Sequence, residues 1–177
     1  MTMSPLSKVT VLSVISLLCY LTFSNSLNNS FMMDDHELIL ADAKAHDMRY
    51  ILRQFTPGEF LSQPAGGLQT YRPLQYIVLR VFYVLFRDNP LGYHCANLIL
   101  FIFACFSIYV LLKKLQFADD IALMATFFYC THPINGMMVN YNTASNLIVQ
   151  VLLFVGTILS SVRFYETKRV GTFVSLV

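Results

Sequence analysis

An apolar run at residues 91–112, LGYHCANLILFIFACFSIYVLL, constrains the fold more than any other feature of this chain. Its 22 residues include no Asp, Glu, Lys or Arg, and a helix of that length, rising about 1.5 Å per residue, crosses the hydrocarbon core of a bilayer. Because no water satisfies backbone groups inside a membrane, such a segment is helical. Charged residues make up 12% of the chain, against about 25% in soluble domains. The sequence therefore predicts an all-α membrane protein.

Further apolar runs occupy residues 9–27, 121–139 and 146–165, and a fifth begins at residue 170 and is cut off at residue 177. Together the runs predict four to five transmembrane helices. The first run also has features of a signal peptide, because it lies near the N-terminus and ends in small polar residues. Its length approaches that of a span and other spans follow it, so we favour a retained first helix.

Residues 28–90 differ from the rest, since they hold more than half of the charged side chains. Apolar residues recur there at spacings of three and four, which predicts an amphipathic helix lying along the membrane surface. These residues are Leu38, Ala41, Ala45, Met48, Leu52 and Phe55. Pro and Gly at residues 56–70 predict a loop. Residues 71–86 predict a second helix that Arg80 interrupts, and so an interfacial or partly buried one.

The chain therefore divides into a first helix at residues 1–27, a large outer loop at residues 28–90 and a group of membrane helices at residues 91–177. Orientation follows from the positive charges, which cluster at alternate helix ends and place the N-terminus in the cytoplasm. They are Lys8, Lys113, Lys114, Arg163, Lys168 and Arg169. The membrane is the plasma membrane in a bacterium or the endoplasmic reticulum in a eukaryote. A net charge of +2 without a basic block excludes a nucleic-acid partner.

Two adjacent acids, Asp34 and Asp35, follow the first helix in the stretch NSFMMDDHELI. Acids in the first turn of a helix interact favourably with the helix dipole and accept orphan N–H bonds. Alternatively, one carboxylate takes a proton from an acceptor hydroxyl while its neighbour orients it or a metal ion. The residues alone leave both interpretations open.

Four more polar residues fall on the same outer side. Arg72 is a suitable ligand for a lipid-linked phosphate. His94 and Asn97 share one helix face because they lie three residues apart, and His132 lies at the end of the next apolar run. The two histidines and the acids also form a possible divalent-cation site. The four cysteines, at positions 19, 95, 105 and 130, make no CxxC pair, which predicts small buried apolar side chains.

The order of the motifs is more specific than any one of them. An acidic pair after the first helix, then TYRPLQYIVLRVFYVLF, NPLGYHCANLILF and ALMATFFYCTHPINGMMVNYNTASNLI, resembles the amino-terminal part of GT-C fold glycosyltransferases. The likeness is to protein O-mannosyltransferase-like proteins that carry tetratricopeptide repeats, and it extends over residues 9–165. The resemblance implies that Asp34 or Asp35 is the catalytic acid and that Arg72 and His94 lie near the lipid phosphate and the acceptor.

The activity implied is transfer of a sugar from a polyprenyl- or dolichyl-phosphate donor to a hydroxyl of a protein or glycan acceptor on the outer face. One departure is that an arginine and an acid commonly follow HP in the family, whereas Asn142 and Ser145 stand there. Since the family has more helices, we expect a fragment or a truncated product. The alternative is a non-catalytic multi-pass membrane subunit. A transporter is less well supported, because the spans carry almost no ionisable residues.

Overall fold

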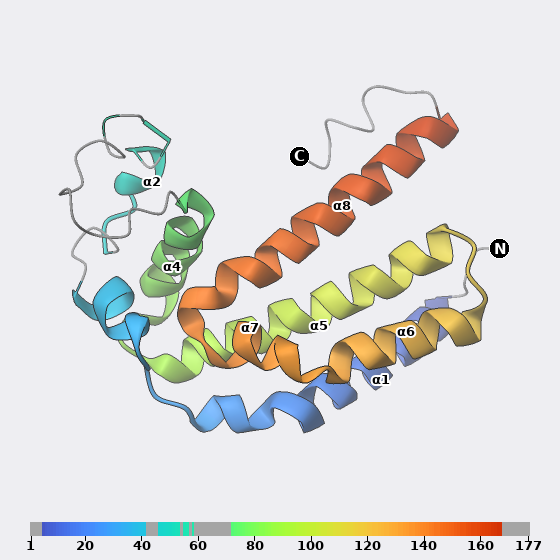
Figure 1. Cartoon of the computed structure of the whole chain (residues 1–177), viewed down its shortest axis with the longest axis horizontal. Helices are drawn as coiled ribbons and strands as arrows, with labels where there is room; N and C mark the ends of the chain where they lie inside the picture. Colours follow the sequence, from blue (N-terminus) through green and yellow to red (C-terminus); the bar gives the residue numbers. More distant parts are fainter. Residues whose placement is uncertain (1–4, 42–45, 54, 57, 59–71, 168–177) are drawn as a thin grey trace.

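The computed structural model describes residues 5–41, 46–53, 55–56, 58 and 72–167. Within these ranges every regular element is helical, which confirms the all-α prediction. Figure 1 shows α1 (Pro5–Phe23), α5 (Pro90–Lys114) and α6 (Asp119–Thr131) running alongside one another. The last helix, α8 (Ser145–Thr167), packs on α5, and α5 also contacts α1 and α6. The long central helix α5 therefore organises the bundle.

Three helical segments of the described chain are long and apolar enough to cross a membrane. They are Lys8–Asn28, Pro90–Lys114 and Asn142–Thr167. Local signals define the ends of α5, because the Asn89 side chain accepts a bond from the Leu91 N–H, and Lys113 and Lys114 complement the dipole at its last turn. The fifth apolar run, from residue 170, lies outside the described residues.

The predicted span at residues 121–139 is wrong in its extent. The helix α6 has 13 residues, or about 20 Å, and ends at Thr131. The next residue, His132, is extended (φ −67°, ψ 127°), since the ring of a following proline disfavours helical backbone. A 3₁₀ turn and the short helix α7 (Gly136–Asn140) then lead towards α8. The region is thus an angled connection rather than one transmembrane helix.

The predicted surface helix around residues 38–55 is also not continuous. The described parts form a π-helix, His36–Ala41, and the single turn α2 (Tyr50–Arg53), with turn residues between them. Apolar burial shapes this region, because Ile39 is fully buried against α4 (Pro73–Phe86). The second predicted helix is confirmed as α4, with Pro73 at its first position. Most of the predicted loop at residues 56–70 lies outside the described residues.

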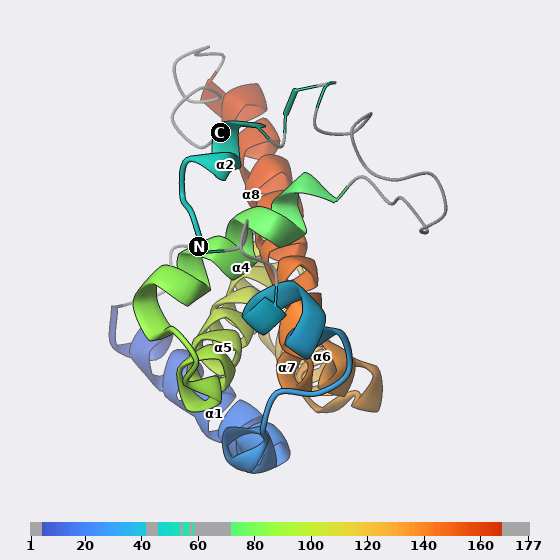
Figure 2. The ribbon, with the colours of Figure 1, turned by 90° about the vertical axis from the view of Figure 1, so that its left-hand side faces the viewer.

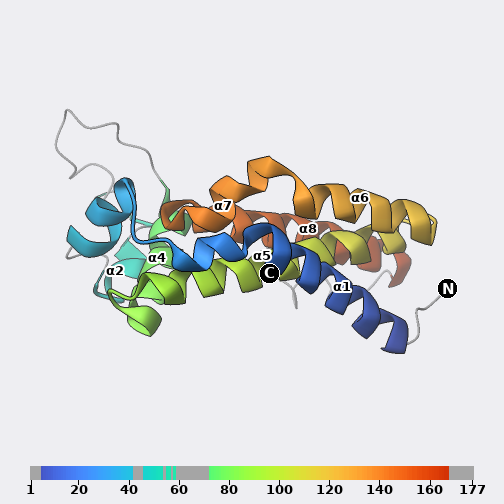
Figure 3. The same ribbon diagram turned by 90° about the horizontal axis from the view of Figure 1, so that it is seen from below.

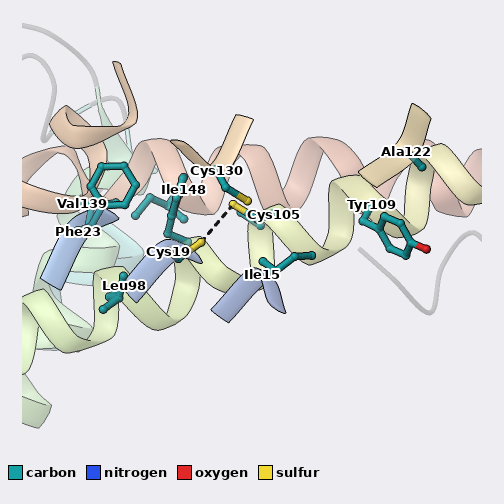
Figure 4. Close-up of a cluster of buried hydrophobic side chains, with 12 residues drawn as sticks. Ile15, Cys19, Phe23, Leu98, Cys105, Tyr109, Ala122, Cys130, Val139 and Ile148 are labelled. Atoms are coloured by element: carbon teal, nitrogen blue, oxygen red, sulfur yellow. Dashed lines mark hydrogen bonds between the residues drawn. The ribbon is translucent and has the colours of Figure 1, made fainter. Parts of the chain in front are cut away.

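Two apolar clusters hold these elements together. One joins α1, α5 and α6 to α7 and α8, and includes Ile15, Leu98 and Ile148 (Figure 4). The other joins the π-helix and α4 to the start of α5 through Ile39, Phe82 and others. Figures 2 and 3 show that α2, α4 and the π-helix gather at one end of the long bundle. That end carries the candidate site.

Candidate functional site

A cleft of about 510 Å³ opens where the start of α4 faces α7 and the first turns of α8. Its charged lining residues are Asp34 and Arg72, which come from opposite ends of the segment that connects α1 to α4. Its other polar lining residues are Gln75, Tyr141, Thr143, Asn146 and Gln150. The cleft therefore offers an acid, a guanidinium and several amides and hydroxyls around one space.

The two adjacent acids have different surroundings. Asp35 is fully buried and its Oδ1 accepts a bond from the Thr143 N–H at 3.0 Å. Its Oδ2 accepts from the Asn142 Nδ2 at 3.1 Å and from the Met32 N–H at 3.2 Å. The last contact closes the turn Met32–Asp35, in which the Asp35 N–H also donates to the Met32 carbonyl at 3.0 Å. Asp35 thus ties its own helix start to the turn before α8, more than 100 residues away.

The turn held by Asp35 is itself part of a polar network. Asn97 of α5 donates from Nδ2 to the Asn142 Oδ1 at 3.2 Å. From the other side, Gln75 of α4 donates from Nε2 to the Thr143 carbonyl at 2.8 Å. Because the hydrogen-bonded groups are buried, each lost partner leaves a costly unsatisfied group. The network fixes the wall of the cleft.

Asp34 is exposed and lies in the cleft wall. It neighbours Tyr141, whose pKa is raised above its ordinary value, first by burial and also by the charge of the Asp34 carboxylate. Tyr141 therefore keeps its proton at neutral pH. A protonated phenol beside a carboxylate is an arrangement that donates a hydrogen bond and leaves the carboxylate able to accept a further proton.

Arg72 is also exposed, immediately before α4. Its backbone is not helical (φ −130°, ψ 62°), because the following Pro73 excludes the helical region. Arg72 lines the same cleft as Asp34. The planar donor fork of its guanidinium suits bidentate contact with a phosphate.

The remaining predicted residues do not line the cleft. His94 is fully buried, and neither ring nitrogen has a hydrogen-bond partner; Asn97 is buried beneath the Asn142 turn. His132 is exposed and accepts a bond from the Ile134 N–H at its Nδ1, as a cap of the 3₁₀ turn. In the described part of the chain no set of three His, Asp or Glu ligands comes together as a divalent-cation site.

Gln75, Tyr141 and Gln150 were not predicted from the sequence. Gln150 carries a spacing signal, since it follows Asn146 by four residues in α8 and so shares its helix face. Gln75 carries no such signal towards Arg72, because the Arg72 backbone is not helical. Tyr141 carries none either, because it is itself the extended residue that joins α7 to the next turn.

In the part of the chain that the structure describes, the fold and the cleft define a class: an all-helical protein with three helices that can cross a membrane, and a polar cleft at one end of them. No family model and no solved structure matches the chain.

Two curated proteins are similar to it. It is 28% identical over 121 residues to the protein O-mannosyl-transferase Tmtc1 of Drosophila melanogaster. The aligned residues cover 67% of this chain and 14% of that protein. It is 26% identical over 161 residues to the protein O-mannosyl-transferase TMTC3 of Homo sapiens, covering 89% of this chain and 17% of that protein. The chain thus spans only a small part of the length of these relatives. The similarities agree with the resemblance carried by the motifs and support a relationship to glycosyltransferases at the family level.

Proposed function

We propose that the chain forms the donor site of a membrane glycosyltransferase of the GT-C type. It transfers a sugar from a polyprenyl- or dolichyl-phosphate to a hydroxyl of a protein or glycan acceptor. The observation that carries the proposal is the meeting of Asp34 and Arg72 in one cleft beside the start of α8. The similarity to two protein O-mannosyl-transferases supports it.

The proposed reaction is a direct displacement. The acceptor oxygen attacks the anomeric carbon, the bond from that carbon to the phosphate oxygen breaks, and the lipid phosphate leaves with the electron pair. Arg72 holds the leaving phosphate through charge-assisted hydrogen bonds. Asp34 takes the proton of the attacking hydroxyl as general base. Tyr141, which keeps its proton, orients the Asp34 carboxylate.

Asp35 acts as a positioning residue in this scheme. Its carboxylate accepts hydrogen bonds from the Asn142 side chain and the Thr143 N–H, and these bonds hold the Asn142–Thr143 turn that forms one wall of the cleft. His94 and Asn97 lie below that wall rather than against the substrate.

The proposed topology places the N-terminus in the cytoplasm and residues 28–90 outside, with residues 1–27 and 91–177 providing the membrane helices. Basic residues at the C-terminal ends of both α5 and α8 support this orientation. These two ends share one side of the bundle, because Lys114 of α5 and Glu166 of α8 form an ion pair at 2.6 Å. The cleft lies at the opposite end of α8, among its first turns. Chemistry therefore occurs on the outer face.

A second candidate is a non-catalytic membrane subunit that binds the lipid phosphate without transferring the sugar. The buried network of Asp35 favours it, because that network gives one acid of the pair a purely structural role. Binding and transfer must therefore be measured separately.

The test uses the whole chain in nanodiscs with dolichyl-phosphate mannose and a serine- and threonine-rich peptide. Asp34→Asn is expected to abolish mannose transfer while donor binding persists, and Arg72→Gln to weaken donor binding. Glu37→Gln is the matched control, because Glu37 is an exposed acid nearby that does not line the cleft. Transfer at the wild-type rate by Asp34→Asn would refute the catalytic assignment. Donor binding without transfer by the wild-type chain would favour the non-catalytic subunit.

A further inference from the structure

Three cysteines from three different helices converge in the centre of the bundle. Cys19 comes from α1, Cys105 from α5 and Cys130 from α6, and each is fully buried. Their sulfur atoms all lie within 4.8 Å of one another, and the Sγ atoms of Cys19 and Cys105 are 3.9 Å apart. Figure 4 shows the three side chains pointing toward one another. None of the three lines the cleft, and this thiol cluster has no part in the proposed function.

We propose that the thiol cluster is a binding site for a single copper(I) ion. A metal ion bound by thiolates at about 2.3 Å, in a plane of three ligands, holds the sulfurs about 4.0 Å apart. The separation of Cys19 and Cys105 matches this spacing without movement of either helix. Isolated buried cysteines behave as small apolar residues, and that role requires no convergence of thiols from three helices.

The number and type of ligands select the ion. Soft thiolates favour copper(I), zinc and iron–sulfur clusters over hard cations. Structural zinc sites are closed by four protein ligands, whereas the described part of the chain brings only these three ligating groups together. The neighbouring Thr126 hydroxyl is already engaged, since it donates to the Ala122 carbonyl at 2.8 Å. A site of three sulfurs with no fourth ligand suits copper(I), because this ion is stable with a low coordination number.

The charge balance is compatible with an apolar site. When copper(I) binds, two thiols lose their protons to solvent and form two copper–thiolate bonds, while the third cysteine coordinates as a neutral thiol. The bound cluster then carries one negative charge, and a third deprotonation would raise the cost of burying it. No oxidant or reductant is consumed, because the ion enters and remains as copper(I).

A groove on the side of the bundle lies against one member of the thiol cluster. An apolar groove of about 460 Å³ runs between α1 and α6, and Cys130 forms part of its wall. The thioether of Met124, an exposed residue, lines the same groove. A thioether is a soft ligand for copper(I), so Met124 provides a first contact on the path to Cys130.

The proposal is tested on the whole chain, purified in detergent without oxygen and loaded with one equivalent of copper(I). Bathocuproine disulfonate then competes for the metal, and copper per protein and the sulfur shell are measured by mass spectrometry and X-ray absorption. We expect one copper per chain with a sulfur-only shell. Cys105→Ser is expected to bind at least about tenfold more weakly, because loss even of an outer-shell partner costs 10–100-fold.

Cys95→Ser is the matched control, since Cys95 lies on the same helix but outside the cluster. If Cys105→Ser fails to fold, as judged by circular dichroism, Cys130→Ser on the groove side replaces it. Retention of no copper by the wild-type chain would overturn the proposal. Equal weakening by Cys95→Ser, or undiminished binding when all three cluster cysteines are alanine, would also overturn it.

Discussion

Replacing Asp35 by asparagine separates its structural role from the role of Asp34. The buried carboxylate accepts three hydrogen bonds, from the Thr143 N–H, the Asn142 Nδ2 and the Met32 N–H. An amide has only one acceptor oxygen, so at best it preserves the two bonds made by Oδ2. Its NH₂ group then faces the Thr143 N–H and leaves a buried donor unsatisfied.

The expected cost follows from these contacts. An unsatisfied buried donor costs about 1–3 kcal/mol, and the two surviving bonds lose their charge assistance, worth roughly 1 kcal/mol each. The neutral amide also avoids the cost of burying a charged carboxylate, and this offsets part of the lost stability. We therefore expect Asp35→Asn to lower the free energy of unfolding by about 2–4 kcal/mol.

The measurement is unfolding in mixed micelles of dodecyl maltoside and SDS, followed by far-ultraviolet circular dichroism. Asp34→Asn is the control, because the exposed Asp34 makes none of these buried bonds; its effect should stay within about 0.5 kcal/mol. An Asp35→Asn protein as stable as the wild type would contradict the reasoning, as would an equal loss in both variants.

Three further predictions concern the turns and the cleft. Gly92→Ala should destabilise the α4–α5 corner by about 1–3 kcal/mol, because a Cβ there would lie 2.5 Å from the Phe86 ring; detergent melting curves test this. Gln116→Gly should stabilise the chain by about 0.5 kcal/mol, because Gln116 has a φ of 66°, a backbone conformation that glycine adopts without strain. A lower melting temperature for this variant in the same curves would contradict the prediction. Asp34→Asn should lower the raised pKa of Tyr141, because a neighbouring negative charge is removed. Phenolate absorbance, compared with Asp34→Asn/Tyr141→Phe, measures the shift, and an unchanged pKa would contradict it.

Some of the fold could be predicted because it depends on local sequence. The run at residues 91–112 and the run at residues 146–165 correspond closely to α5 and α8, since helix formation by a long apolar segment needs no knowledge of its neighbours. Proline marks two local boundaries as well, since Pro73 begins α4 and Pro133 follows the end of α6. Hydropathy alone, however, extended the run at residues 121–139 across Pro133, because an average over apolar residues does not register a break in the backbone.

The thiol cluster shows what periodicity cannot predict. Cys19, Cys105 and Cys130 are separated by tens of residues and belong to different helices, so no spacing rule relates them. The sequence predicted that each would be a buried apolar side chain, and their burial is confirmed. Their convergence depends on how α1, α5 and α6 pack.

By itself the sequence determined that this protein is helical, that it has segments able to cross a membrane, and that Asp34 and Asp35 follow the first of them. Only the tertiary structure decided which acid does what. Successive residues on a helical turn point about 100° apart, so two identical neighbours cannot both face the core. Packing against the Asn142–Thr143 turn directs Asp35 inward and leaves Asp34 in the cleft with Arg72.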